Sequence, residues 1–359
     1  MAAPTAADSV RLRAATMVSF IADVLATCGL RGPDAERVGM LMVEADLVGA
    51  GGHGIFRLPQ YVRRLRAGGT NPTPDITVSR RAPAVAIVDG DNGMGHLVMS
   101  RAAEVAVELA REAGVAWVGA RRSNHAGAGG VYACLPLEAG MIGIYTVVAS
   151  ANHMAPWGGT ESLLGTNPLA IAIPMGAADP VVLDIATTVV SYGTVKAYAL
   201  LGETMPEGWM IDQTTGAPLT DPRRSAEGIL LPIGGHKGSG LALMLGLLAG
   251  PLNRAAFGRD VVDFNADDRT VTETGHVMIA LDVARFLDPA AFQAEVARHL
   301  DDLRTSAPMP GVERIRLPGD ARAERRRDHL AHGVPLSMPL LAQLDRLAAE
   351  AGVPALRAR

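Results

Sequence analysis

The sequence predicts an α/β fold of mixed α+β type, in which α-rich segments at the two ends of the chain flank a central α/β region. Three observations predict it. Apolar residues recur at helical spacing over residues 13–48, strand and helix patterns alternate from about residue 84, and helices with charged faces return from about Pro289. A chain of 359 residues is long enough for about two domains.

The N-terminal segment is expected to hold three helices. The first ends near Cys28, and the second starts at Pro33, which suits the first turn of a helix. After a glycine cluster, a short helix is expected from Pro59 to Arg66. A polar, Pro-rich connector over residues 67–83 then separates these helices from the central region.

The central region alternates between strands and helices, and two adjacent strands within residues 169–186 exclude a pure βαβ repeat. The expected strands are residues 85–90, 115–123, 141–150, 169–174, 180–186 and 276–286. The expected helices are residues 96–114, 129–140, 187–202 and 239–252, the last of them buried.

Composition and charge exclude several classes of function. The net charge of −4 and the pI of about 6.1 predict neither a nucleic-acid partner nor an anionic membrane surface. The longest apolar stretch, residues 241–248, is too short to span a bilayer. Residues 1–15 do not have the pattern of a secretory signal, and Cys28 and Cys134 show no metal or redox spacing. We therefore expect a cytoplasmic protein with two reduced thiols.

The stretch GAGGHGIFRLP (49–59) contains the Gly-x-Gly-x-x-Gly pattern of a dinucleotide-binding turn, but its context does not support that function. Such a turn needs a preceding strand, a following helix and an acidic residue about twenty positions later. Here the preceding segment has helical spacing, Pro59 follows too soon, and no acid occurs before Asp75. The glycines are better explained by a tight turn after a helix.

His53 and Arg57 remain as the chemically interesting residues of this stretch. An imidazole exchanges protons near neutral pH, and a guanidinium four residues later offers a fork that fits a carboxylate. On these residues alone, a structural role near a turn is the more common alternative.

Six further stretches follow this one in order along the chain. They are DGDNGMGH (89–96), RRSNHAGAGG (121–130), APWGGTESLLGTNPLAIAIP (155–174), VVLDIATTVVSYG (181–193), LLPIGGHKGSGLALML (230–245) and SAPMPGVERIRLPGD (306–320). Together with HGIFRLPQYVRRL, they resemble the malate/L-lactate dehydrogenase family that is distinct from the Rossmann-type enzymes. The resemblance covers about residues 10–355. The family includes ureidoglycolate, sulfolactate and 2,3-diketogulonate oxidoreductases and Δ1-piperideine-2-carboxylate/Δ1-pyrroline-2-carboxylate reductase.

The resemblance implies a non-Rossmann sulfolactate/malate dehydrogenase-like fold and a reaction with NAD(H) or NADP(H). We expect residues 1–75 together with 289–359 to form an α-rich domain that carries the histidine and arginine, and residues 76–288 to form the α/β domain that binds NAD(P). The substrate is expected to be a small carboxylate, and the enzyme a homodimer whose active site draws on both subunits. Whether the cofactor is NAD or NADP is not readable from the sequence.

The same resemblance assigns the catalytic and substrate-binding residues. His53 matches the proton donor, and Asp184 matches an aspartate that would orient its imidazole; His125 matches a position that is the acid/base in some members. Arg57 is assigned to the substrate carboxylate. Asn124 and Thr166 are expected to contact the substrate. The structural alternatives are that Asp184 caps a helix beginning near Thr187 and that Thr166 belongs to a turn.

Three stretches are expected to bind the cofactor. The backbone N–H groups at a helix start, over Ala186, Thr187, Thr188 and Val189, suit a pyrophosphate. His236, Lys237 and Gly238 would provide a cation and close backbone approach, and Gly319 with Asp320 would contact the cofactor from the C-terminal segment. Lys237 as a solvated surface lysine is the alternative. His329 and His332 fit a solvated helix face, and we expect no metal site.

Gly52 stands where the family has a serine before the catalytic histidine, which removes one hydrogen-bond donor. HGIFR and GGHKGS are more similar to the cyclic imino acid reductases, whereas SNHAGAGG fits the broader family. We therefore expect hydride transfer to C2 of a 2-imino or 2-oxo acid. A malate-, lactate- or ureidoglycolate-type 2-hydroxy acid dehydrogenase is the alternative. From other classes, a non-catalytic cofactor-binding homologue and a zinc hydrolase are weaker alternatives.

Overall fold

The computed structural model describes residues 9–359. The expected absence of a secretory signal concerns residues 1–15, of which residues 1–8 lie outside the described part. Three N-terminal helices are confirmed: α1 (Ala14–Ala26), α2 (Gly32–Leu47) and α3 (Leu58–Ala67). Pro33 lies in the first turn of α2, and Gly68, with φ +83°, ends α3 in the left-handed conformation.

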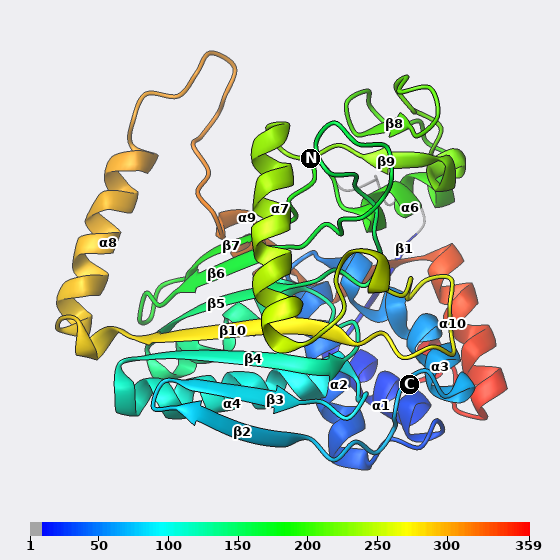
Figure 1. The fold of residues 1–359 in the computed structure, drawn as a ribbon, viewed down its shortest axis with the longest axis horizontal. Helices are drawn as coiled ribbons and strands as arrows, with labels where there is room; N and C mark the ends of the chain where they lie inside the picture. The colour runs from blue at the N-terminus through cyan, green and yellow to red at the C-terminus, as the bar shows by residue number, and fades with distance from the viewer. Residues whose placement is uncertain (1–8) are drawn as a thin grey trace.

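A seven-stranded sheet forms the centre of the molecule, in the order β2-β3-β4-β10-β5-β6-β7 (Figure 1). Its strands are β2 (Thr77–Ala82), β3 (Val85–Asp89), β4 (Val115–Ser123), β5 (Met141–Val147), β6 (Leu169–Ile173), β7 (Val181–Ile185) and β10 (Thr274–Asp282). Only the β3–β4 pair is parallel, and α4 (Gly95–Ala113) connects its two strands. The mixed α/β prediction is confirmed.

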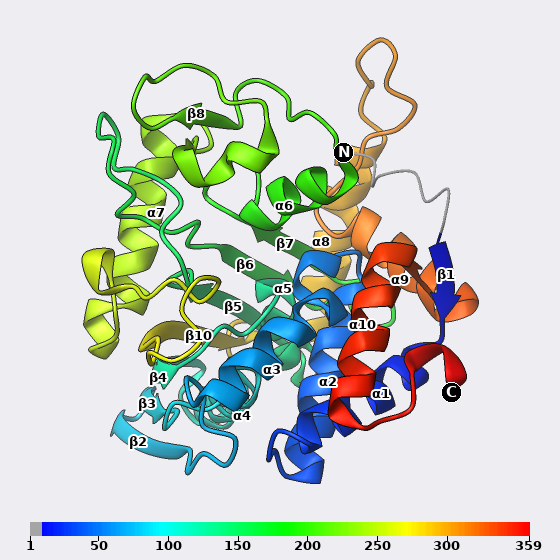
Figure 2. The ribbon, with the colours of Figure 1, turned by 90° about the vertical axis from the view of Figure 1, so that its right-hand side faces the viewer.

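Helices cover both faces of this sheet (Figures 1 and 2). On one face, α4, α5 (Gly129–Ala133) and the 3₁₀ turn Leu135–Ala139 pack on a core rich in alanine and valine. On the other face, α7 (His236–Ala249) lies against β5 and β10, and the 3₁₀ turn Pro251–Asn253 that follows it lies against β4. The small side chains allow helices to approach the strands closely.

A second core lies beside the sheet, where α1, α2 and α3 pack with α10 (Met338–Ala351) (Figure 2). Two short strands at its edge, β1 (Ser9–Leu12) and β11 (Val334–Ser337), pair antiparallel and were not predicted. A third, smaller core holds α6 (Tyr192–Leu201) with the hairpin β8 (Met210–Asp212) and β9 (Gly228–Leu230).

The C-terminal segment contains the expected helices α8 (Pro289–Arg304) and α9 (Asp320–His332) besides α10. α8 contributes no buried residue, and it stands away from the rest of the molecule together with the loop that follows it (Figure 1).

Three predictions about the central region are wrong. The connector 67–83 contains β2, an edge strand whose residues are all exposed and which therefore shows no alternation of apolar and polar residues. The helix expected from residue 187 begins only at Tyr192, where Ser191 caps it. The helix expected to be buried, α7, exposes several large apolar side chains, namely Leu243, Met244 and Leu247.

Candidate active site

The glycine-rich stretch forms a compact turn between α2 and α3. Gly49 follows α2 with φ +80°, a conformation that favours glycine. Two 3₁₀ turns, Gly51–His53 and Ile55–Arg57, then lead directly into α3. A helix precedes the stretch, as predicted from its spacing, so it lacks the strand of a dinucleotide-binding turn.

Asp46, in the last turn of α2, holds the glycine-rich stretch in place by a hydrogen bond. Its Oδ2 accepts the backbone N–H of Ile55 at 2.8 Å. A Cβ at Gly54 would fall on the Asp46 carboxyl group, so this position requires glycine. Burial raises the pKa of Asp46 to about 7. This position of Asp46 was not predicted from the sequence, because an aspartate within a helical pattern matches no motif that would mark it as part of a site.

His125 is placed by a loop that hydrogen bonds hold from several sides. Asn124 is 3% exposed, and its Nδ2 donates to Oδ1 of Asn92 at 2.9 Å. Its Oδ1 accepts from the hydroxyl groups of Thr70 and Thr272 at 3.2 and 3.1 Å. All the polar atoms of the Asn124 side chain are thus used by the protein. Asn124 therefore fixes the loop that carries His125, and its expected contact with the substrate stays a prediction.

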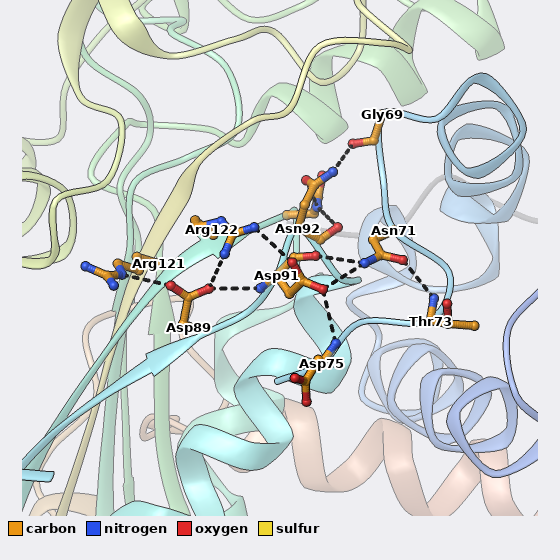
Figure 3. Close-up of polar contacts among 10 residues, drawn as sticks. Gly69, Asn71, Thr73, Asp75, Asp89, Asp91, Asn92, Arg121 and Arg122 are labelled. Atoms are coloured by element: carbon orange, nitrogen blue, oxygen red, sulfur yellow. Dashed lines mark hydrogen bonds and ion pairs between the residues drawn. The ribbon is translucent and has the colours of Figure 1, made fainter. Parts of the chain in front are cut away.

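A network of charged side chains fixes residues 89–92 (Figure 3). Asn92 in this segment accepts a hydrogen bond from the side chain of Asn124. Arg122 donates to Asp89 and to Asp91, both at 2.9 Å, and Arg121 donates to Asp89 at 3.1 Å. Asp91, Asn92 and Arg122 all have positive φ, which is uncommon for residues other than glycine. The network holds this tightly bent backbone in place beside the end of β4.

The two candidate acid/base histidines lie next to each other. The rings of His53 and His125 stack with centroids 5.7 Å apart, and Phe264 stacks on His125 at 4.9 Å. The hydroxyl group of Tyr61 lies 2.7 Å from Nδ1 of His125. Nδ1 of His53 is buried and has no hydrogen-bond partner among residues 9–359.

Both imidazoles are neutral at physiological pH. Burial, and then the charge of Arg57, lower the pKa of His53 to about 4. The same two causes hold the pKa of His125 well below its usual range. Burial raises the pKa of Tyr61, so its phenol stays protonated, and its hydroxyl group bonds Nδ1 of His125 as donor or as acceptor according to the tautomer of the ring. This bond fixes the orientation of the His125 ring and leaves Nε2 as the nitrogen that Tyr61 does not occupy.

Arg57 is 8% exposed and binds only neutral oxygen atoms. Its Nε donates to the carbonyl of Gly52 at 2.9 Å, and its Nη1 donates to Oδ1 of Asn265 at 3.1 Å. Within residues 9–359 it forms no ion pair. A buried guanidinium without a bound carboxylate is suited to bind an anionic ligand.

Asp184 does not orient an imidazole in this structure. Its Oδ2 accepts the backbone N–H of Gly130 at 2.8 Å, in the first turn of α5. No hydrogen bond joins it to His53 or His125 in the described part of the chain. The alternative that it caps the helix after it is also wrong, since that helix begins at Tyr192. Its carboxylate instead satisfies the start of α5.

The segment 186–189 is not the start of a helix, and two of its four N–H groups are bound within the protein. The N–H of Thr187 donates to the carbonyl of Thr166 at 2.9 Å, and that of Val189 donates to the carbonyl of Leu231 at 2.8 Å. The hydroxyl group of Thr187 also donates to Thr166, and that of Thr188 donates within the segment, to the carbonyl of Val190. Thr166 thus lies beside this segment, and its carbonyl is already used there. Ala186 precedes these contacts, directly after β7.

The start of α7 has the features of an anion-binding helix terminus. Gly235 precedes it with φ +64°, and His236 and Lys237 at its first two positions are exposed. The indole of Trp157 lies edge-on to His236, with ring centroids 6.3 Å apart. The position of a Cβ at Gly238 would lie 2.8 Å from the carbonyl oxygen of Thr187, so the two expected cofactor stretches are neighbours.

Gly319 and Asp320 lie at the edge of the sheet that β7 forms. The N–H of Val182 donates to the carbonyl of Pro318 at 3.3 Å, and Gly319 has φ +102°. The Asp320 carboxylate is bound by Arg304 at 2.8 Å and by the N–H of Leu317 at 2.9 Å. The carboxylate therefore stabilises the start of α9, and no contact in the described residues links it to α7.

Four residues near the two histidines were missed or left without a function in the sequence analysis: Tyr61, Phe264, Asn265 and Lys196. Only Tyr61 had a usable signal, because it follows Arg57 by four residues and helical spacing places both on one face.

Residues 9–359 contain no cluster of three potential metal ligands and no helix long and apolar enough to cross a membrane.

Comparison with known proteins agrees with this fold. A family model described as malate/L-lactate dehydrogenase matches residues 12–345. Malate dehydrogenase of Pyrococcus abyssi is 35% identical over 97% of this chain and 96% of its own length. L-sulfolactate dehydrogenase of Methanocaldococcus jannaschii is 37% identical over 93% of this chain and 95% of its own.

Two further relatives name their cofactors. Ureidoglycolate dehydrogenase (NAD(+)) of Escherichia coli K12 is 32% identical over 89% of this chain and 91% of its own. (2R)-3-sulfolactate dehydrogenase (NADP(+)) of Chromohalobacter salexigens is 34% identical over 85% and 88%.

Solved structures show the same fold. Malate dehydrogenase from Entamoeba histolytica superposes with a TM-score of 0.92, at 29% identity over 96% of this chain and 99% of its own. Δ1-piperideine-2-carboxylate reductase from Pseudomonas syringae superposes with a TM-score of 0.82, at 29% identity over 94% and 100%.

The fold, the site and these similarities define an NAD(P)-dependent dehydrogenase. The chain belongs to the malate/L-lactate dehydrogenase family, and its cofactor is NAD or NADP.

Proposed function

We propose that the enzyme transfers hydride between NAD(P) and C2 of a small 2-oxo or 2-hydroxy acid. One observation carries the proposal: the hydroxyl group of Tyr61 holds His125 through Nδ1, beside His53 and close to the buried Arg57, which forms no ion pair within residues 9–359. A proton carrier and a carboxylate-binding cation are the two groups that this reaction requires of the protein.

Each side chain then has a defined task. Arg57 binds the substrate carboxylate through its guanidinium. During reduction the imidazolium form of His125 donates its Nε2 proton to the C2 oxygen and is left as the neutral imidazole, which accepts that proton again during oxidation, while Tyr61 holds Nδ1. The substrate carboxylate bound at Arg57 offsets the positive charge that lowers the pKa of His125. His53 stacks on His125 and remains the alternative acid/base, because its Nδ1 is not bound by the protein.

The cofactor, when bound, supplies or accepts the hydride at its nicotinamide ring. The residues at the start of α7 fit such a ligand, since two exposed cationic or polar side chains and a helix N-terminus meet there. We propose that Lys237 and His236 bind its phosphate groups. Trp157, which is 62% exposed beside them, offers a surface on which a planar ring can stack.

Reduction of a cyclic 2-imino acid is the second candidate function. The similarity of HGIFR and GGHKGS to that branch of the family and the superposition on the Pseudomonas syringae reductase support it. A protonated cyclic imine already carries its proton, so an acid residue would then serve mainly in placement. The relatives that act on 2-hydroxy acids support the first candidate at least as well.

We also propose that the enzyme is a homodimer. α8, the residues just before it and the loop over residues 305–317 bear exposed apolar groups, and α8 stands away from the rest of the molecule with the loop that follows it (Figure 1). These are Phe286, Leu287, Leu303, Met309 and Val312. A second copy of the chain would remove them from water. Light scattering is expected to give twice the mass of one chain, and a stable, active monomer would contradict the proposal.

Absorbance at about 340 nm, where the reduced cofactor absorbs, tests the proposed reaction. NADH and NADPH are each mixed with pyruvate, oxaloacetate, sulfopyruvate, Δ1-piperideine-2-carboxylate and Δ1-pyrroline-2-carboxylate. Oxidation with an oxo acid supports the first candidate, and oxidation only with the imines supports the second. No oxidation with any of the five favours a non-catalytic, cofactor-binding protein.

A further inference from the structure

Two cations meet at one neutral oxygen atom on the edge of the proposed substrate site. Nη1 of Arg57 and Nζ of Lys196 both donate to Oδ1 of Asn265, from 3.1 and 2.9 Å. Two donors that share one acceptor at these distances are at most about 6 Å apart. The amide oxygen has no net charge, so it does not neutralise either cation.

Asn265 is itself fixed with its oxygen toward these cations. Oδ1 of Asp263 accepts from the backbone N–H of Asn265 at 2.8 Å and from its Nδ2 at 3.0 Å. Because Nδ2 is bound to a carboxylate, rotation of the amide would lose this contact and turn a donor toward two donors. The charge of Asp263 acts on Arg57 and Lys196, but within residues 9–359 it forms an ion pair with neither.

α6 brings Lys196 to this position. Nζ of Lys196 lies 5.3 Å from the ring centroid of Tyr192, one turn earlier, and His153 stacks on the same ring at 3.7 Å. The start of the helix faces the arginine, since Nη2 of Arg57 lies 3.9 Å from the position that a Cβ of Gly193 would take. The partial positive charge of the helix N-terminus therefore adds to the two cations.

We propose that Lys196 binds a second acidic group of the substrate, a carboxylate or sulfonate remote from C2, while Arg57 binds the C1 carboxylate. The inference rests on the proposed hydride transfer and names its substrate class: 2-oxo or 2-hydroxy acids with an acidic group one carbon beyond C2. In such molecules the two acidic groups are about 4 to 5 Å apart. This separation fits between the two cationic nitrogens, and an anionic oxygen is a stronger acceptor than the Asn265 amide.

A lysine that only stacks on Tyr192 is the simpler explanation, and two observations favour the anion site. Burial, together with the nearby Arg57, lowers the pKa of Lys196, so the protein environment disfavours its charge. An anion bound between the two cations would remove this penalty. In addition, only two of the 33 Lys and Arg residues in the chain are lysines, Lys196 and Lys237, and both lie at proposed anion sites.

Malate and lactate of the same hand form a matched pair for the test, because they differ only by one terminal carboxylate. Calorimetry measures their dissociation constants with the enzyme loaded with reduced cofactor, which leaves 2-hydroxy acids unreacted. Lys196→Gln removes the charge but retains a donor for Asn265, and Lys196→Arg retains the charge. Arg223→Gln is the control, since Arg223 is an exposed cation whose ion pair is with Asp221.

The wild type is expected to bind malate at least about tenfold more tightly than lactate, the preference that one charge-assisted hydrogen bond provides. Lys196→Gln loses this preference without weakening lactate binding, Lys196→Arg keeps most of it, and Arg223→Gln matches the wild type. Equal binding of the two acids by the wild type, or an unchanged preference in Lys196→Gln, overturns the proposal. Failure of hydride transfer appears separately, in the absorbance assay, and does not alter these affinities.

Discussion

The hydroxyl group of Tyr61 lies 2.7 Å from Nδ1 of His125 and is the bonding partner of that nitrogen. Tyr61 is 4% exposed and His125 lies between two stacked rings, so water does not readily replace the phenol. Tyr61→Phe is therefore expected to lower kcat about ten- to hundredfold, the effect of losing one buried hydrogen bond that orients a reacting group. Steady-state kinetics of the oxo acid reduction measure it. Tyr198→Phe, a matched change in α6 where the ring packs edge-on against Trp209, should leave kcat unchanged, and an equal loss in both variants would contradict this role.

Alanine variants of the two histidines test which of them transfers the proton. With His125 as the acid, His125→Ala should lose most of kcat on an oxo acid, by about a hundredfold or more. His53→Ala should lose less, because a ring that stacks on His125 supports it without carrying the proton. Rates of both variants with the same oxo acid decide between them. A His125→Ala enzyme at full rate would assign the proton to His53.

Gly52 and Gly54 differ in what a side chain would meet. A Cβ at Gly52 has no heavy atom within 4 Å, whereas one at Gly54 would fall on the Asp46 carboxyl group. Gly52→Ser should therefore leave the unfolding temperature unchanged while altering KM and the ranking of substrates. Gly54→Ala should destabilise the protein by about 1–3 kcal/mol, as overpacking does. Thermal denaturation and a substrate panel test both, and equal stability of the two variants would contradict the packing described for this turn.

Because the pKa values of its buried histidines are lowered, the protein is expected to lose stability in acid. Burial lowers the pKa of His96 and of His276 to about 3, and that of His53 and of His153 to about 4. Between these values and about 6.5 the unfolded chain binds more protons, so the free energy of unfolding falls as the pH falls. Asp46, with its pKa raised to about 7, and Asp184, whose pKa burial also raises, have the opposite effect. They are two groups against these four histidines and His125, whose pKa burial lowers as well.

His96 allows a direct test, since it is 1% exposed and neither ring nitrogen has a partner among residues 9–359. His96→Leu should reduce the slope of unfolding free energy against pH between about 4 and 6 by up to about 1.4 kcal/mol per pH unit. Urea denaturation at several pH values measures this slope. An unchanged slope in His96→Leu would contradict the assignment.

The sequence allowed prediction of elements whose pattern is local. α2 and α4 were found because apolar residues follow the helical period, and β5 because it is a long apolar run. The start of α6 was misplaced, because Thr187 and Thr188 fit a helix start as well as they fit the irregular segment that Thr166 holds. β2 was missed because an edge strand exposed along its length has no apolar face.

The candidate site could be predicted only in part, for a related reason. His53, Arg57 and His125 lie within recognisable motifs, but the groups that determine their chemistry come from distant parts of the chain. Asn265 lies 208 residues from Arg57 and follows no regular element, and Lys196 occupies an ordinary helical position. Contacts of this kind arise from tertiary packing and leave no periodic trace in the sequence.

Transfer of deuterium tests the central claim most directly. Reduced cofactor carrying deuterium at both C4 positions of the nicotinamide is incubated with the enzyme and its preferred oxo acid, and the product is analysed by mass spectrometry and NMR. The account predicts deuterium at C2 of the product, at a rate that Arg57→Met and His125→Ala both strongly reduce. Product without deuterium at C2, or full-rate transfer in both variants, would contradict it.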